Sequence, residues 1–476
     1  MNPATHQRLT LAGSITGAAI VALDGTVLTV AQPSMQRDLH ASFAAVQWTS
    51  TGYLIAVASL LVFAGRLGDR YGHQRVFSIG VLGFAAASAG IAVAPGTGWV
   101  VALRTVQGVA GALLQPATLG MLRAAYPADR LAMPIALRTS AIGLAAAAGP
   151  LVGGALTAHL GWRAVFLLTV APAVAAGLLA LAVRLPQPPG DRTAGLDLPG
   201  AALLAAALVC LVHTLVGVPE HGWTATTVLG LLGAVLLGVA FVRRERRTAH
   251  PLLPPRVLRS ATVGPALGVL LAASAAIFGT LFLATYFLQD VLSLDPLQSA
   301  LRGLPLAVTM VLAAPASAVL LRRHGARRTV ASGMVLIAVG AALASRFDHS
   351  SGAPAIGAAF LLLGTGFGTV MVTATAVLVR SASVADAGVA GGLQQTAMNI
   401  GPALGVAAAT TLTAGRPLAE AMGPALLALS GVAALGAVLA GRLPGTGAGA
   451  GAAPTPSDTP SAAPSTAPST APSTAE

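Results

Sequence analysis

Long apolar segments, separated by short polar connections, constrain this chain more than any other feature of its sequence. A helix that crosses a bilayer needs about 20 mostly apolar residues, and fourteen segments meet that length. They cover residues 10–32, 45–64, 76–95, 98–123, 131–159, 163–184, 198–217, 224–242, 261–289, 297–321, 328–346, 352–379, 386–413 and 421–441. The sequence therefore predicts an all-α integral membrane protein with fourteen transmembrane helices in one bundle.

The composition supports a membrane protein and disfavours several other classes. Of the 476 residues, 55% are hydrophobic and only 9% are charged, too few charges to cover a soluble protein of this size. The 55 glycines suit close packing between membrane helices. The net charge of +12 comes from arginines in the short connections, so it does not indicate nucleic-acid binding. The single cysteine, Cys210, excludes an internal disulfide.

The placement of the arginines predicts the orientation. Twenty of them lie in connections on one side of the predicted bundle and five on the other. Cytoplasmic connections carry the excess of basic residues, so we expect both termini in the cytoplasm and an even number of helices. Arginine without lysine, in an alanine-rich chain, is typical of a GC-rich bacterial genome. We therefore expect a multi-pass protein of the bacterial cytoplasmic (inner) membrane.

A repeated basic connection predicts an internal duplication. The arginine-rich stretch 66–75 has a counterpart at 322–328, after the second helix of what would be a second six-helix half. We expect two six-helix halves over residues 10–184 and 261–441, with an inserted helix pair over 198–242. Twelve helices with an amphipathic linker at 198–242 is the alternative. The Ala/Pro/Ser/Thr-rich tail, 443–476, is predicted to be disordered.

Asp24 is the sharpest candidate for a functional site, because it is the only acid well inside a predicted helix. A charged, unpaired carboxylate in a membrane is costly, and such residues usually belong to a transport pathway. Desolvation favours the neutral acid, which would let Asp24 exchange a proton. Arg104 falls at a similar depth by helical rise, and its proximity would favour the charged carboxylate. A purely structural ion pair, or an Asp facing water at a helix end, are the alternatives.

Polar side chains in two other segments are candidates for the wall of a cavity. Helical spacing places two glutamines on the Arg104 side of segment 98–123. Three amides fall within segment 386–413, where they are costly unless they face a cavity or one another. We expect a cavity, with interhelical packing as an equal alternative. The candidate lining residues are Gln107, Gln115, Gln394, Gln395, Met398 and Asn399.

Four motifs carry a family resemblance, and one of them is the set of Arg104, Gln107 and Gly108 in segment 98–123. The connection 65–75, GRLGDRYGHQR, resembles the signature loop of the major facilitator superfamily. The run 149–154, GPLVGG, is similar to a motif of exporters in that superfamily, and 23–33, LDGTVLTVAQP, is similar to one in its fourteen-helix drug:proton antiporter branch. The residues that match the loop are Gly65, Gly68, Asp69, Arg70, Gly72 and Arg75, and those that match the exporter motif are Gly149, Pro150, Gly153 and Gly154.

The resemblance implies a function and a role for the loop. It implies a proton-coupled antiporter that exports a lipophilic drug, antibiotic or metabolite by alternating access, working as a monomer. A cationic substrate could pair only with Asp24. Asp69 would stabilise one gating state at a helix N-terminus, where an anion is favoured. We expect this N-terminus to be the one of segment 328–346, with Arg123 as a further partner of Asp69.

Other functions fit the sequence less well. A proton-coupled importer of a small metabolite is the main alternative, and a receptor or scaffold is a second. An enzyme is disfavoured, because no metal-ligand cluster or nucleophile constellation occurs in the sequence. The chain has no nucleotide-binding loop, so we expect no ATP, no cofactor and no metal, with the proton motive force as the energy source.

Overall fold

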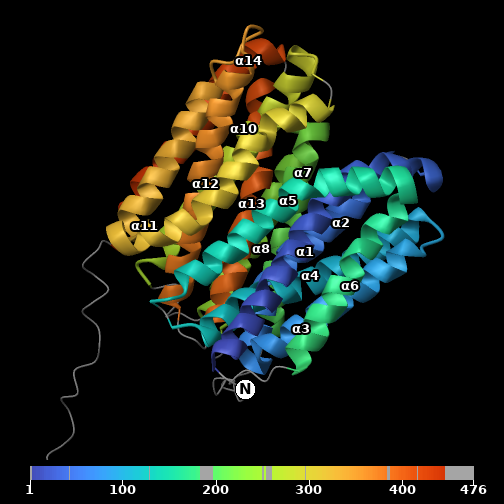
Figure 1. The fold of residues 1–476 in the computed structure, drawn as a ribbon, viewed down its shortest axis with the longest axis vertical. Coiled ribbons are helices and arrows are strands. Elements are labelled where there is room, and N and C mark those ends of the chain that lie inside the picture. Colours follow the sequence, from blue (N-terminus) through green and yellow to red (C-terminus); the bar gives the residue numbers. More distant parts are fainter. Residues whose placement is uncertain are drawn as a thin grey trace, which may run out of the picture.

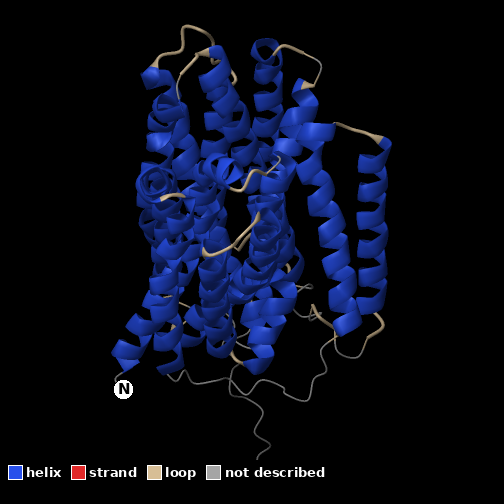
Figure 2. Cartoon of the chain, turned by 90° about the vertical axis from the view of Figure 1, so that its right-hand side faces the viewer, coloured by secondary structure: helices blue, strands red, loops and turns tan. Residues whose placement is uncertain are grey.

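Many of the helices run roughly along the long axis of the molecule, with loops at both of its ends and a few loops at mid-height (Figure 2). The computed structural model describes residues 3–41, 43–127, 129–182, 197–248, 251–253, 260–294, 296–382, 386–414 and 416–444. Within these ranges the structure is helical and contains no strand, so the predicted all-α class is confirmed. Nearly all of the predicted tail lies outside the described residues.

The helices of the two predicted halves follow the apolar segments closely. The first half contains α1 (Pro3–Asp38), α2 (Phe43–Tyr71), α3 (His73–Ala92), α4 (Thr97–Ala125), α5 (Ala132–Leu160) and α6 (Trp162–Ala182). The second contains α10 (Val263–Tyr286) with the short π-helix η1 (Phe287–Val291), α11 (Pro296–Ala344), α12 (Ala353–Ser381), α13 (Ala387–Thr413) and α14 (Leu418–Ala440). Between them come α7 (Leu198–His221) and α8 (Ala225–Glu245).

The helices gather into two groups that lie side by side. In Figure 1 the blue-to-green helices α1–α6 form one group and the yellow-to-red helices α10–α14 the other. The groups meet where α13 packs on α2 and α4, and where α11 and α12 pack on α5. Helix α7 lies against α2 and α13, and α8 packs on α7. The three-part division of the chain agrees with this packing but stays a prediction.

Twelve of the described helices are long and apolar enough to cross a membrane. Helix α11 is one of them, although Gly325 interrupts it with a non-helical φ of 77° and thereby separates the two predicted segments 297–321 and 328–346. Helix α13 is not one of them, because its amides lower its hydropathy. Fourteen spans are compatible with this structure. Both α7 and α8 meet the criterion, which disfavours the amphipathic linker.

The hairpin of α7 and α8 is closed at one end by a charged pair. Asp197 precedes α7, where its carboxylate accepts a hydrogen bond from the Gly200 amide at 3.0 Å. Arg244, at the end of α8, donates to the same carboxylate from Nε at 2.9 Å. The hydrogen bond from Arg244 holds the pKa of Asp197 below its usual range. The pair therefore ties the start of one helix to the end of the other.

Glycines set the closest helix crossings in the second group. A methyl group on Gly405 of α13 would overlap the carbonyl of Ala275 in α10, and one on Gly279 of α10 would lie 2.7 Å from the Gly405 carbonyl oxygen. Helices in lipid associate through such close backbone approach, because lipid is as apolar as their side chains.

We predict that Gly405→Leu destabilises the protein by about 1–3 kcal/mol, because the new side chain forces α10 and α13 apart. Gly431→Leu in α14 is the matched control, since no atom lies within 4 Å of the place where its Cβ would stand. Thermal unfolding in detergent measures both variants. Equal midpoints for the two would contradict the role of Gly405.

Candidate functional site

A buried ion pair joins α1 to α4 in the interior of the first helix group. Arg104 Nη1 donates to Asp24 Oδ2 at 2.6 Å. Asp24 is 5% exposed and Arg104 is 1% exposed. The structure thus brings together two residues that are 80 positions apart in the chain. The sequence had predicted that they lie at a similar depth. Burial removes water from both charges, so each depends on the other and on nearby hydrogen bonds.

Further polar groups form hydrogen bonds with both members of this pair. Gln107 of α4 donates from Nε2 to Asp24 Oδ1 at 3.3 Å and to Ser88 Oγ of α3 at 2.7 Å, and its Oε1 accepts from Arg104 Nη1 at 2.5 Å. Arg104 Nε donates to the Thr49 carbonyl of α2 at 3.1 Å. Helices α1, α2, α3 and α4 therefore all contribute to one buried network. Gln107, a candidate cavity-lining residue, belongs to this network.

An aromatic ring covers the guanidinium of Arg104. Its Cζ lies 4.3 Å from the centroid of the Tyr53 ring on α2, a cation–π contact. The Tyr53 hydroxyl is buried and has no hydrogen-bond partner among the described residues. No motif or charge in the sequence singles out Tyr53, Thr49 or Ser88, because uncharged side chains such as these can occur anywhere in an apolar helix. Only the packing of α2 and α3 on α4 brings them to the pair.

The glycines of the exporter-like motif pack α5 against α1 next to Asp24. A methyl group on Gly149 would overlap the side chain of Thr26, and one on Gly153 would lie 3.1 Å from the carbonyl oxygen of Val27. Gly154 faces Val30 at ordinary contact distance. The crossing lies within the first helix group, two residues beyond Asp24. Pro150 is part of α5.

Helix α5 also contacts the second group. Ser140 Oγ donates to the Val311 carbonyl of α11 at 2.9 Å. A methyl group on Gly143 would lie 2.6 Å from Met310 Cε. Helix α5 thus contacts both α1, which contains Asp24, and α11 of the second group.

The signature loop holds the two groups together at the end of α2. Asp69 accepts hydrogen bonds from the backbone amides of Gly388 at 2.7 Å and Val389 at 3.0 Å, in the first turn of α13. A carboxylate is favoured there, because the free amides and the helix dipole carry positive charge. His73 Nε2 lies 3.3 Å from Asp69 Oδ1.

The helix that Asp69 contacts differs from the expected one. We expected the N-terminus of segment 328–346, with Arg123 as a further partner. That segment is the second part of α11 and packs on α12 and α14, whereas α13 lies across the interface on α2. The described ion pairs of Asp69 include His73 and not Arg123.

The other loop residues differ in how far they are constrained. A methyl group on Gly65 would overlap the Gly388 carbonyl, and one on Gly68 would lie 2.5 Å from His73 Nδ1. Gly72 has a φ of 96°, a conformation that favours glycine. Arg70 is half-buried, with its guanidinium 5.3 Å from the centroid of the Tyr71 ring, and Arg75 is exposed.

The remaining candidate lining residues separate into two places. Gln395 Nε2 donates to Gln115 Oε1, a hydrogen bond that joins α13 to α4 across the two groups. Gln394 is fully buried, and neither of its amide atoms has a partner among the described residues. Met398 and Asn399 line a cavity of about 280 Å³ between α2, α7 and α13, together with residues such as Leu54 and Val212.

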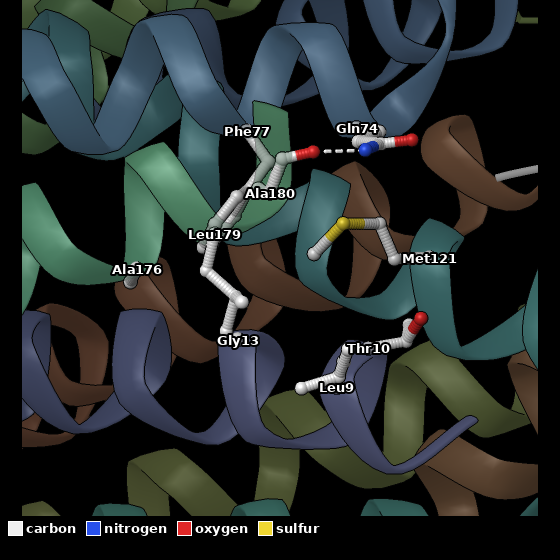
Figure 3. A pocket seen from close by; sticks show the side chains of 9 residues that line it. All are labelled: Leu9, Thr10, Gly13, Gln74, Phe77, Met121, Ala176, Leu179 and Ala180. Atoms are coloured by element: carbon white, nitrogen blue, oxygen red, sulfur yellow. Dashed lines mark hydrogen bonds between the residues drawn. The ribbon is translucent and has the colours of Figure 1, made fainter. Parts of the chain in front are cut away.

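A second, smaller pocket lies between α1, α3, α4 and α6 (Figure 3). Its walls are mostly apolar, and Gln74 closes one side by donating from Nε2 to the carbonyl of Ala180. Its volume of about 20 Å³ is close to that of one water molecule. It is too small for a drug-sized compound. Among the described residues, no group of three or more His, Cys, Asp or Glu could hold a metal ion.

Comparison with known proteins places this arrangement of helices in a family. The family model described as Major Facilitator Superfamily matches residues 15–406, so the chain belongs to that superfamily. Membership makes the protein a membrane transporter rather than an enzyme.

Relatives within the superfamily are export and resistance proteins. The tetracenomycin C resistance and export protein of Streptomyces glaucescens is 41% identical, with 86% of this chain and 76% of that protein covered. The puromycin resistance protein of Streptomyces alboniger is 34% identical, with 83% and 80% covered. The human organic anion transporter MFSD10 shares the fold at a TM-score of 0.68 and 16% identity, over 91% of this chain and 99% of that one.

We predict that Asp24→Asn destabilises the protein by about 3–5 kcal/mol, because Arg104 loses its counter-charge while it stays buried. The matched control is Asp129→Asn, whose carboxylate is exposed and 3.9 Å from Arg130 Nε. Thermal or denaturant unfolding in detergent checks both, and the control should leave the midpoint unchanged. A similarly small effect for Asp24→Asn would mean that its environment is wetter than the burial implies.

We also predict that Asp69→Asn lets the adjoining ends of α2 and α13 separate more often, because the neutral amide binds the α13 amides less strongly. Nitroxide labels report the separation by electron–electron double resonance. They are placed at Arg75→Cys, at the start of α3 just after the loop, and at Arg380→Cys, at the end of α12 just before α13, in a Cys210→Ser background. Asp69→Asn should add a longer-distance population that Asp129→Asn does not. An unchanged distribution would show that Asp69 does not hold this contact.

Proposed function

We propose that this protein exports a lipophilic antibiotic, drug or metabolite across the bacterial cytoplasmic membrane in exchange for protons, by alternating access. The observation that carries the proposal is the buried pair of Asp24 and Arg104, an acid and a base placed inside a membrane transporter. The resistance and export functions named for the relatives support the outward direction. The proton motive force drives the exchange without ATP, and both termini lie in the cytoplasm.

Asp24 is the proton site in this proposal. When its carboxylate takes a proton, the charge of Arg104 is left uncompensated in a buried place, which is strongly unfavourable. Arg104 keeps only neutral acceptors, the Thr49 carbonyl and the Gln107 amide oxygen. Protonation therefore favours a conformation in which Arg104 reaches water or a different partner. Deprotonation restores the closed pair.

Helix α5 gives this change a route to the opposite half. Its glycines contact Thr26 and Val27, directly after Asp24. Ser140 and Gly143 of the same helix contact α11. A shift of α1 around the carboxylate would therefore move α5 against α11, because close-packed glycine crossings leave no slack. Asp69 at the first turn of α13 stabilises one of the two end states.

Proton movement in inside-out membrane vesicles tests the proposal. Tetracenomycin C is added to vesicles with an imposed pH gradient, and the collapse of the gradient is followed by a fluorescent pH probe. We expect collapse with wild-type protein and a rate at least about tenfold lower for Asp24→Asn, because the variant has no carboxyl to carry the proton. Asp129→Asn should behave as wild type.

Each other outcome has a distinct meaning. Collapse that persists in Asp24→Asn would keep antiport and move the proton site elsewhere. No collapse with this compound, together with proton-driven uptake of a metabolite by whole cells, would favour the importer. An unstable Asp24→Asn protein is recognised by its elution profile in detergent. In that case Asp24→Glu, which keeps the carboxyl, should restore a substrate-dependent collapse.

A further inference from the structure

A second arginine is buried in the membrane region, and the proposed proton site does not use it. Arg138 of α5 is 1% exposed. None of the described carboxylates forms an ion pair with it. Arginine cannot lose its proton in a protein, so the positive charge persists. An intramembrane charge of this kind is rare and marks a functional site by default.

Only one nitrogen of Arg138 is engaged within the described part of the chain. Its Nε donates to Thr118 Oγ1 of α4 at 3.0 Å. The two terminal nitrogens make no hydrogen bond with a described residue. A guanidinium has five donors in a planar fork, and the fork matches the two oxygens of a carboxylate or sulfonate. The Thr118 contact fixes the stem of the fork and leaves its end for a ligand.

The surroundings of Arg138 place it between the two helix groups. Thr118 Oγ1 donates in turn to the Gln115 carbonyl at 2.7 Å, and Gln115 Oε1 accepts from Gln395 of α13. Arg138 lies about 9 Å along α5 from its first residue, and Gln395 about 12 Å along α13. They are therefore at a similar level, on opposite sides of the interface.

Gln394 adds an independent observation at this level. It precedes Gln395 on α13, is fully buried, and has a free amide donor and a free amide acceptor. Buried amides normally find hydrogen-bond partners in the protein or in a bound molecule. An unpaired cation on one side of the interface and an unpaired amide on the other are complementary to a polar, negatively charged ligand.

Asp24 cannot be the missing counter-charge. Its partner Arg104 is 14 residues before Thr118 on the same helix, which separates the two levels by about 21 Å. The carboxylate is also already engaged by Arg104 and Gln107. The two intramembrane arginines thus differ: one has a carboxylate partner in the chain and the other has none.

We propose that Arg138 binds an acidic group of the exported compound, so that the substrate class is lipophilic organic anions carrying a carboxylate, sulfonate or similarly acidic group. This rests on the proposed export function and specifies its substrate. It also replaces the expectation of a cation that pairs with Asp24, since that carboxylate is held by Arg104. The rest of the compound would lie among the apolar side chains between the helix groups.

Two fluorescent aromatic probes test the proposal. Anilinonaphthalene sulfonate and phenylnaphthylamine share one skeleton and differ by the sulfonate. Their dissociation constants are measured by equilibrium dialysis against the full chain in phosphatidylcholine nanodiscs, with empty nanodiscs subtracted. We expect wild type to bind the sulfonated probe at least about tenfold more tightly than the neutral one. No preference in wild type would overturn the proposal.

Variants at the same position assign the preference to the guanidinium. Arg138→Gln should weaken binding of the sulfonated probe by about tenfold or more and leave the neutral probe unchanged. Arg138→Lys should give an intermediate loss, because it keeps the charge without the fork. If Arg138→Gln does not fold, Arg138→Lys carries the test. An unchanged preference in either folded variant, or an equal loss for both probes, would overturn the assignment.

Two further arms separate related explanations. A lipid headgroup also carries an anion, so the dialysis is repeated with phosphatidylglycerol in the nanodiscs. The preference should survive, and its loss would assign Arg138 to the headgroup instead of the substrate. Because binding needs no gradient, a sulfonate preference without proton-driven transport would leave this site standing while antiport fails. Antiport without the sulfonate preference would support the proposed export function and overturn the Arg138 site.

Discussion

The absence of water from the interior of a bilayer is the constraint on which this structure depends. Backbone groups there must bond to one another, so the spanning elements are helices. Side chains obey the same rule. Thr26, for example, donates to the carbonyls of its own helix at Ala22 and Leu23. Charged groups need a counter-charge or several hydrogen bonds. Asp24 and Arg104 supply each other's counter-charge, whereas Arg138 has no ion-pair partner among the described residues.

The same constraint explains why glycines lie at the closest contacts between helices. Apolar side chains gain little by leaving lipid for one another, so helices associate where their backbones approach closely. The crossing of α5 on α1 at Gly149 and Gly153 puts such an approach beside the acid. The contact of α2 with α13 at Gly65 and Gly388 puts another beside Asp69. At the second place the close approach brings the Asp69 carboxylate of α2 to the backbone amides of α13.

The charges also divide the interior into two levels. The pair of Asp24 and Arg104 lies within one half, so in the proposed mechanism its protonation needs no contact with the ligand. Arg138 and the amides of Gln394 and Gln395 lie where the halves meet, so a ligand there would contact both. If the proton and the substrate bind at these two places, as proposed, only helix movement can link them. Helix α5 contains Arg138 as well as the glycines that contact α1.

The sequence by itself determined the helical class, the extents of nearly all the helices, and the superfamily, because an apolar run of fixed length and a short loop motif are local properties. It also predicted that Asp24 and Arg104 lie at a similar depth, since helical rise is regular. Only the tertiary structure decided that Asp69 meets α13 rather than segment 328–346, and that Tyr53, Thr49 and Ser88 complete the pair. It also separated Arg138 from every described carboxylate. The physical reason is that helical rise specifies position along a helix, whereas the neighbours around it depend on how all the other helices pack.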